Sequence, residues 1–152
     1  MANPADVSSI DAIINAAYDG ISGPAGKKRD WDRERSLFLP GARLIPTAME
    51  AGQNEGGLAP QFLDVEAYIA RVEPYFQENG FYEKEIARRT EQAGQIAHVW
   101  STYESRHSKD DPEPFMRGIN SIQLFYDGTR WWIANIYWQH ETEKDPIPAK
   151  YL

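Results

Sequence analysis

The chain has 152 residues, of which 41% are hydrophobic, and this is enough for one domain with a well-buried core. Its net charge of −7 and the absence of a basic stripe exclude a nucleic-acid backbone as the expected partner. Because it contains no cysteine, disulfide bonds, thiol nucleophiles and thiolate metal sites are also excluded.

The N-terminal half predicts three helices. Residues Ser8 to Gly20 are expected to form the first, because apolar residues recur on one helical face. A short second helix is expected after Asp30, and a third after Asp64, with Pro74 kinking or ending it. Between them, residues 42–45 predict a short strand, and residues 48–60 a flexible loop or loose hairpin.

The C-terminal half predicts antiparallel strands. Residues 81–90 and 95–106 are expected to be strands around the turn at Ala93-Gly94. Residues 117–141 predict a hairpin, because two apolar, aromatic-rich runs flank Asp127-Gly128. The last residues, 144–152, form a polar tail with two prolines. Helices followed by antiparallel strands indicate an α+β fold.

The pattern resembles the NTF2-like superfamily, the SnoaL-like or cystatin-like group of cone-shaped α+β proteins. The resemblance rests on the first helix ending in AAYDGISG, the run RDWDRERSLFLPGARLI, and the strand AHVWSTYE followed by a hairpin with FYDGTRWWI. It implies three helices packed on a strongly curved antiparallel sheet, in a single domain over residues 1–152 with an ordered core from about residue 8 to 142. The superfamily contains isomerases, dehydratases, hydrolases, cyclases and binding proteins, so the fold does not choose a function.

Ketosteroid isomerases of this fold carry a tyrosine and two aspartates. Matched on the Leu-Phe pair and the Asp-Gly turn, these positions fall near Ile14, Pro46 and Ile122, none of which can carry a proton. That isomerase chemistry is therefore not expected here. A scytalone-dehydratase-like mechanism would need paired histidines in the cavity, which His98 and His140 could supply, although the motif itself is not matched.

Strand alternation divides the hairpin between two faces. Together with the resemblance, it predicts that Asn120, Ile122, Asn135 and Tyr137 face the cavity of the cone. Five more side chains are expected to complete a ligand-binding site, namely Tyr18, Trp31, Phe38, Tyr68 and Trp100. On the strand 95–106, His98 is the candidate proton carrier and Glu104 its candidate partner, although a structural histidine is the commoner case.

The opposite face of the hairpin predicts a homodimer interface. Phe125, Trp132, Ile136 and Trp138 are too apolar together to be left in water. No metal spacing or cofactor motif is visible, so none is expected. Without a secretory signal or a spanning segment, a cytoplasmic protein is expected.

Two functional hypotheses follow from the sequence. The first is binding of a small apolar or aromatic ligand in the cone cavity, without catalysis. The second is a cofactor-free acid–base enzyme, an isomerase, dehydratase, cyclase or hydrolase, acting on a small hydrophobic metabolite. An enzyme should show titratable groups of perturbed pKa in the cavity, whereas a binding protein should show only neutral donors.

Overall fold

The computed structural model describes residues 1–47 and 59–152, so the predicted loop at residues 48–60 lies almost entirely outside the described part. The helices are α1 (Pro4–Val7), α2 (Ile10–Ile21), α3 (Trp31–Arg35), α4 (Val65–Glu78) and the 3-10 helix η1 (Ala149–Tyr151). The strands are β1 (Phe38–Pro46), β2 (Tyr82–Ala93), β3 (Ile96–Arg106), β4 (Met116–Tyr126) and β5 (Trp131–His140).

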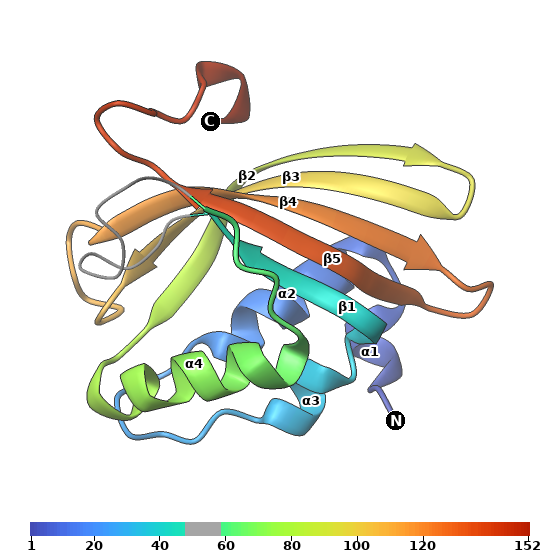
Figure 1. The fold of residues 1–152 in the computed structure, drawn as a ribbon, viewed down its shortest axis with the longest axis horizontal. Coiled ribbons are helices and arrows are strands. Elements are labelled where there is room, and N and C mark those ends of the chain that lie inside the picture. Colours follow the sequence, from blue (N-terminus) through green and yellow to red (C-terminus); the bar gives the residue numbers. More distant parts are fainter. Residues whose placement is uncertain (48–58) are drawn as a thin grey trace.

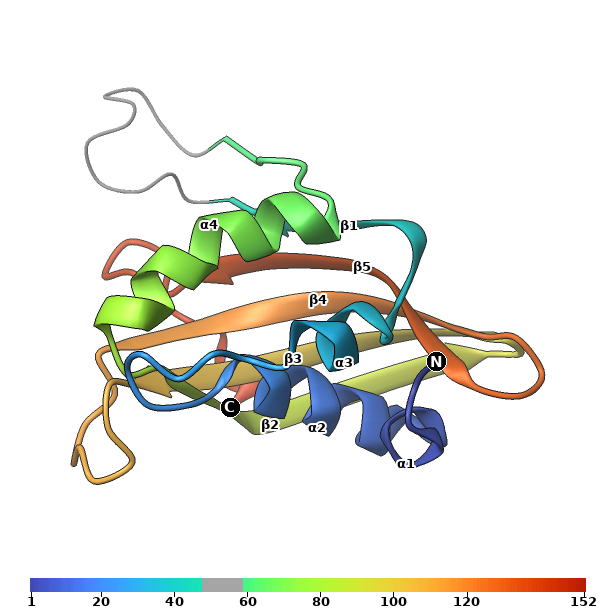
Figure 2. The ribbon, with the colours of Figure 1, turned by 90° about the horizontal axis from the view of Figure 1, so that it is seen from below.

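The strands form one curved sheet in the order β1-β5-β4-β3-β2. The expected antiparallel pairing holds from β2 to β5, but β1 departs from it by running parallel to β5 at the edge. No hairpin links these two strands, because all the other strands lie between them in sequence. Figures 1 and 2 show α1 to α4 on one face of the sheet and the C-terminal segment on the other.

Helix α2 provides the first layer over the concave face. Ser9, one residue after the expected start of the helix, caps it by accepting a hydrogen bond from the backbone N–H of Ala12 at 3.0 Å. Ile13 and Ile14 on the apolar face are fully buried in the main core, as the periodicity predicted.

Helix α4 begins after Asp64, whose side chain caps Ala67, and it continues beyond Pro74 to Glu78. Pro74 therefore does not end the helix. The end of α4 is held against the residues that follow it, because the ring of Phe76 stacks on that of Phe81 with centroids 5.0 Å apart. The helix ends at Asn79.

A bulge in β5 reverses the faces predicted for the second half of the hairpin. Leu124 pairs with Ile133 while the preceding Gln123 pairs with Asn135, so Ala134 is left without a partner in the ladder. The one extra residue shifts the alternation by one position. Beyond it, Ile136, Trp138 and His140 line the cavity and not the convex face. The alternation predicted for β4 is correct, since Asn120, Ile122 and Leu124 are buried on the inner side.

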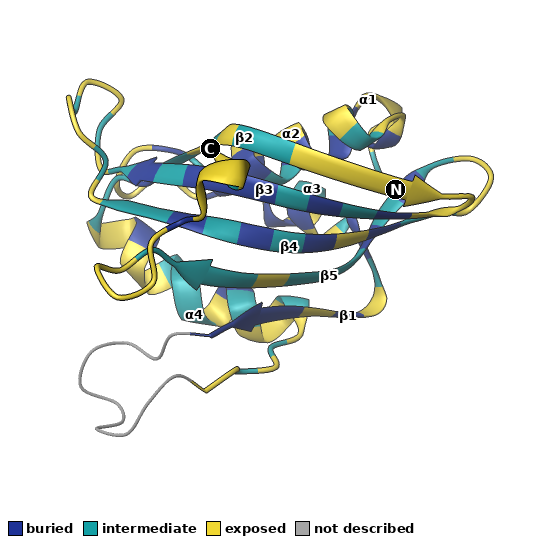
Figure 3. Cartoon of the chain, turned by 90° about the horizontal axis from the view of Figure 1, so that it is seen from above, coloured by how far each residue is buried: buried dark blue, intermediate teal, exposed yellow. Residues whose placement is uncertain are grey.

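The alternation predicted for β3 is wrong. Val99, Ser101 and Tyr103 face the core, which places the alternate residues on the convex face. There the C-terminal residues cover part of the strand, as Figure 3 shows for the segment that crosses the sheet. The hydroxyl of Thr102 donates to the carbonyl oxygen of Tyr151 at 2.7 Å. The ring of Trp100 lies 5.1 Å from that of Tyr151.

The loop between α2 and α3 is held by the buried guanidinium of Arg29. It donates to the backbone carbonyl oxygens of Ile21, Gly23, Pro24 and Lys27 at 2.7–3.1 Å. The bond to Ile21 satisfies a carbonyl group at the end of α2 that has no helical partner, and the other bonds hold the loop itself. Together they keep the loop in place where α3 begins, and α3 forms part of the cavity wall.

Candidate functional site

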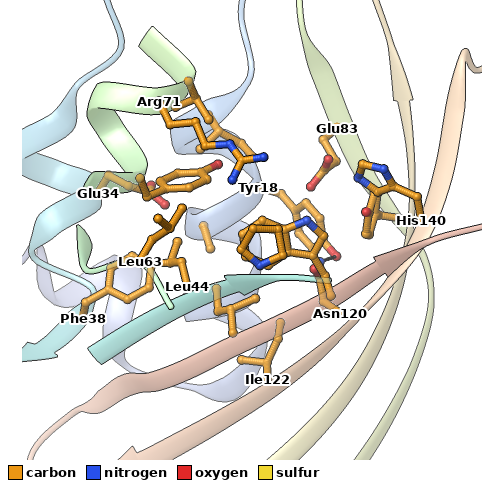
Figure 4. A pocket seen from close by; sticks show the side chains of 18 residues that line it. Tyr18, Glu34, Phe38, Leu44, Leu63, Arg71, Glu83, Asn120, Ile122 and His140 are labelled. Carbon is orange, nitrogen blue, oxygen red and sulfur yellow. Dashed lines mark hydrogen bonds between the residues drawn. The ribbon is translucent and has the colours of Figure 1, made fainter. Parts of the chain in front are cut away.

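A cavity of about 440 Å³ lies between the concave face of the sheet and the helices. Figure 4 shows its side chains converging from the helices and the strands. The lining consists of Ala17, Tyr18, Ile21, Glu34, Phe38, Leu44, Pro46, Leu63, Tyr68, Arg71, Val72, Glu83, Tyr103, Asn120, Ile122, Ile136, Trp138 and His140. Ten of these eighteen side chains are apolar and eight are polar, and an apolar majority with convergent polar groups is usual for small-molecule sites.

Five of the side chains predicted for the site lie in this cavity, namely Tyr18, Phe38, Tyr68, Asn120 and Ile122. The stripe on α2, the face of α4 and the alternation of β4 account for four of them, and Phe38 comes from the start of β1. Tyr18 lies four residues after Ile14 and shares its helix face, and Asn120 lies two residues before Ile122 and shares its strand face. Ile14 and Ile122 are two of the positions that were matched with the isomerase residues.

The cavity placement predicted for four other side chains is wrong. Trp31 belongs to a second core cluster, where its ring stacks on Phe76 and its indole N–H donates to Glu73 at 3.3 Å. Trp100 lies on the convex face against the C-terminal segment. Asn135 and Tyr137 point outward because of the bulge at Ala134, and Tyr137 is 42% exposed.

The two candidate catalytic residues of β3 also lie outside the cavity. His98 Nε2 is 2.9 Å from Ser121 Oγ, and both residues are on the convex side. The carboxylate of Glu104 accepts from Arg106 and lies 3.2 Å from Lys84 Nζ. The opposite parity of β3 accounts for both errors, and the proposed pair does not form.

Sequence reasoning missed the charged residues of the cavity, namely Glu34, Arg71 and Glu83, and it considered His140 only as the partner of His98 in a histidine pair. A signal existed for two of them. Glu34 lies three residues from both Trp31 and Leu37, which are buried, and Arg71 lies three residues after Tyr68 on the same helical face. Glu83 and His140 depended on strand registers that the sequence did not reveal.

A chain of hydrogen bonds leads from the cavity to the outer edge of the sheet. Asn120 Nδ2 donates to the hydroxyl oxygen of Tyr18 at 2.9 Å, and that hydroxyl is 2.7 Å from Ser101 Oγ. Ser101 in turn donates to Glu85, which is paired with Arg88. The Tyr18 hydroxyl therefore donates to Ser101. Burial and the charge of Glu83 raise the pKa of Tyr18, so its hydroxyl stays protonated.

Glu83 is the cavity carboxyl whose pKa lies closest to neutrality. Burial raises its pKa to about 7, although a hydrogen bond from Ser105 Oγ at 3.0 Å acts in the opposite direction. Its negative charge also contributes to the raised pKa values of Tyr18, Tyr68 and Tyr103. Glu83 thus lies at the electrostatic centre of the polar end of the cavity.

Arg71 and His140 complete this end. Arg71 Nη1 donates to Gln61 Oε1 at 2.5 Å, and the guanidinium lines the cavity. Burial and then the positive charge of Arg71 lower the pKa of His140, so the imidazole is neutral at pH 7. Figure 4 shows Arg71, Glu83 and His140 around the same side of the cavity.

Glu34 is the second buried carboxyl. It is 3% exposed, and burial raises its pKa to about 8. A methyl group at Gly20 would overlap Glu34 Oε2, so the missing side chain of this glycine makes room for the carboxyl group.

Neither a metal cluster nor a membrane-spanning helix is present in the part of the chain that the structure describes. No group of three or more histidine, aspartate or glutamate side chains in residues 1–47 and 59–152 is placed to hold a metal ion. No helix in these ranges is long and apolar enough to cross a membrane.

Solved structures show which class of fold this is. An NTF2-like protein of unknown function from Silicibacter pomeroyi is 16% identical with a TM-score of 0.58, covering 88% of this chain and 94% of its own. One from Pseudomonas putida is 13% identical with a TM-score of 0.64, covering 91% and 89%. A ketosteroid isomerase-like protein from Parabacteroides distasonis is 13% identical with a TM-score of 0.60, covering 95% and 98%.

These likenesses establish a cone-shaped α+β fold. More specifically, the chain has the NTF2-like fold, also called cystatin-like, as the resemblance in sequence implied. No family model and no curated protein matches the sequence. The identities are too low to transfer an activity from these proteins to this chain.

Proposed function

We propose that the protein is a cofactor-free acid–base enzyme that acts on a small, mostly apolar molecule carrying a carbonyl or carboxylate oxygen. One observation carries this proposal: Glu83, with a pKa of about 7, lines a cavity with a mostly apolar wall together with the guanidinium of Arg71. General acids and bases work best when their pKa lies near the working pH.

The walls favour a flat, apolar ligand. Phe38, Leu44, Ile122, Ile136 and Trp138 present aromatic and branched surface, and a volume of about 440 Å³ lies in the range of small-molecule sites. The edge-to-face packing of Tyr68 on Trp138, with centroids 6.1 Å apart, gives part of this wall a fixed shape.

The polar groups fit a proton transfer beside a carbonyl. The Glu83 carboxylate takes a proton from the substrate carbon next to the carbonyl, and the protonated carboxyl returns it to the product. Arg71 offsets the negative charge that develops on the substrate oxygen. The neutral imidazole of His140 and the amide of Asn120 provide hydrogen bonds that orient the substrate.

Binding without chemistry is the second candidate. The mostly apolar wall favours it, and so does the hydrogen bond that Asn120 Nδ2 donates to the Tyr18 hydroxyl, because that hydroxyl in turn donates to Ser101 and has no proton left for a substrate. In that case Glu83 and Arg71 would fix only the orientation of a bound molecule.

Exchange of substrate protons for deuterium separates the two candidates. Small aromatic ketones such as acetophenone and 1-indanone would be incubated with the protein in heavy water and followed by NMR. We expect exchange next to the carbonyl above the buffer rate, and Glu83→Gln should reduce it by a factor on the order of 10²–10⁴. Glu104→Gln is the matched control, because Glu104 lies on the convex face of the adjacent strand.

The outcomes discriminate clearly. Ketones that bind, as shown by thermal shift, but exchange no faster than in buffer would favour the binding function. An exchange rate that is equal in Glu83→Gln and in the wild type would exclude Glu83 as the proton carrier.

We also propose that the convex face forms a homodimer, with an interface that differs from the one expected from alternation. Phe125 and Trp132 remain on this face, whereas Ile136 and Trp138 line the cavity. The exposed Tyr137 takes their place in the proposed interface. Sedimentation of Tyr137→Asp should then show monomers, and an unchanged dimer would place the interface elsewhere.

A further inference from the structure

Glu34 has a carboxyl oxygen that nothing in the protein satisfies. Among the described residues, its Oε2 is the buried side-chain oxygen without a hydrogen-bond partner. A buried carboxyl without a partner is costly and uncommon, because folding removes it from water without replacing the lost hydrogen bonds. Such a group in a cavity wall calls for an explanation other than stability.

The surroundings keep this carboxyl free. The nearby Arg33 is already held by Asp6 at 2.8 Å and 3.0 Å and by Asp19 at 2.5 Å, so its donors are directed away from Glu34. Gly20 provides the space in which the carboxyl lies. The side chain is therefore accommodated by the fold but not paired by it.

The location of Glu34 separates it from the polar end already described. Figure 4 shows its carboxyl group directed toward the cavity from α3, on the side away from Glu83 and His140. Apolar side chains such as Leu44 and Ile122 line the same cavity. A molecule that spans the cavity would thus meet a polar group at each end.

We propose that Glu34 is a ligand-binding and specificity-determining residue that accepts a hydrogen bond from a hydroxyl or ammonium group of the substrate. This rests on the proposed function and narrows the substrate class to molecules with a carbonyl or carboxylate at one end and an N–H or O–H donor at the other. A carboxyl group has more acceptor sites than donor sites, so a donor on the ligand satisfies it in either protonation state.

Three benzoates of similar shape provide the test: 4-hydroxybenzoate, 4-(aminomethyl)benzoate and 4-methylbenzoate. Their dissociation constants would be measured by calorimetry with the wild type, Glu34→Met and Glu34→Gln. We expect the wild type to bind at least one of the two donor compounds about tenfold more tightly than 4-methylbenzoate, as befits a buried hydrogen bond to a carboxyl group. The hydroxyl and ammonium compounds distinguish the two kinds of donor.

In Glu34→Met this preference should disappear or reverse, because an apolar side chain of similar size then faces the donor group of the ligand. Glu34→Gln keeps an acceptor oxygen and should retain part of the preference for the hydroxyl compound. Asp32→Asn is the matched control on the same helix, since its side chain is 94% exposed, and it should bind like the wild type. Melting temperatures of all variants show that each is folded.

The outcomes separate this inference from the proposed function. If the benzoates bind and their ranking is unchanged in Glu34→Met, Glu34 does not select the ligand, whereas the role of Glu83 stands. Equal binding of all three compounds by the wild type also contradicts the inference. If none of the three binds, this inference is refuted, whereas the proposed function is decided by the exchange of the ketone protons.

Discussion

The buried carboxyl of Glu34 should make the stability of the protein depend strongly on pH. The pKa of this carboxyl group is about 8 in the folded protein, whereas that of an ordinary glutamate is 4.5. Because the folded state holds this proton more tightly than the unfolded state, the free energy of unfolding falls as pH rises from about 4.5 to about 8. Asp6, Asp19 and Arg33 surround the group, and their charges partly cancel.

The size of the effect follows from the shift in pKa. At about 1.4 kcal/mol per unit, a rise from 4.5 to about 8 corresponds to roughly 5 kcal/mol at most between acid and alkaline pH. This is comparable with the entire stability of many domains, which is about 5–15 kcal/mol. Glu34→Gln removes the titration, so its stability relative to the wild type should increase steadily over this range.

The measurement is urea unfolding followed by tryptophan fluorescence from pH 4 to pH 9. Glu83 titrates in both proteins and cancels in the difference, whereas Asp32→Asn should follow the wild type at every pH. If the curves of Glu34→Gln and the wild type run parallel across this range, Glu34 has an ordinary pKa and burial does not raise it.

Three further predictions concern groups around the cavity. Gly20→Ala should destabilise the protein by about 1–3 kcal/mol, measured by urea unfolding, because the new methyl group overlaps the carboxyl of Glu34. Ser105→Ala removes a hydrogen bond that lowers the pKa of Glu83, so the carboxyl resonance of Glu83 in carbon-13 NMR should titrate at higher pH than in the wild type. Tyr18→Phe leaves buried partners unsatisfied and should lower the unfolding free energy by about 1–3 kcal/mol.

Each of these variants has a control. Gly20→Ala combined with Glu34→Ala should recover the stability lost through the overlap, and no recovery would contradict its cause. Tyr137→Phe alters an exposed hydroxyl and should leave the unfolding free energy unchanged, in contrast to Tyr18→Phe. An unchanged titration of Glu83 in Ser105→Ala would mean that the hydrogen bond does not influence its pKa.

The elements were predictable from sequence where a local pattern determined them. The apolar stripe of α2 identified a helix and its buried face, and Asp64 marked the start of α4. The Asp127-Gly128 turn placed the hairpin, with Gly128 at a φ of 100°. These signals lie within a few residues of each other, and tertiary packing agreed with them.

The site was predictable only in part, because strand faces depend on contacts distant in sequence. Ala134 carries no mark of a bulge, yet it brings Trp138 and His140 into the cavity. On β3 both sets of alternating residues contain aromatic side chains, and the C-terminal segment buries Thr102 on the outer face as well. Alternation alone therefore could not identify the inner face of this strand.

The bulge at Ala134 also determines where the chain tolerates a change in length. Deleting Ala134 would remove the one residue of β5 that lacks a partner in β4, and Ile136, Trp138 and His140 would keep facing inward in a regular ladder. Deleting Tyr137 instead would turn Trp138 outward, so that a different side chain would take its place in the cavity wall. A deletion scan that removes one residue of β5 at a time, with the melting temperature as readout, should show a single tolerated position in the middle of the strand. At that position the strand loses a residue, but the side chains of the cavity wall stay the same.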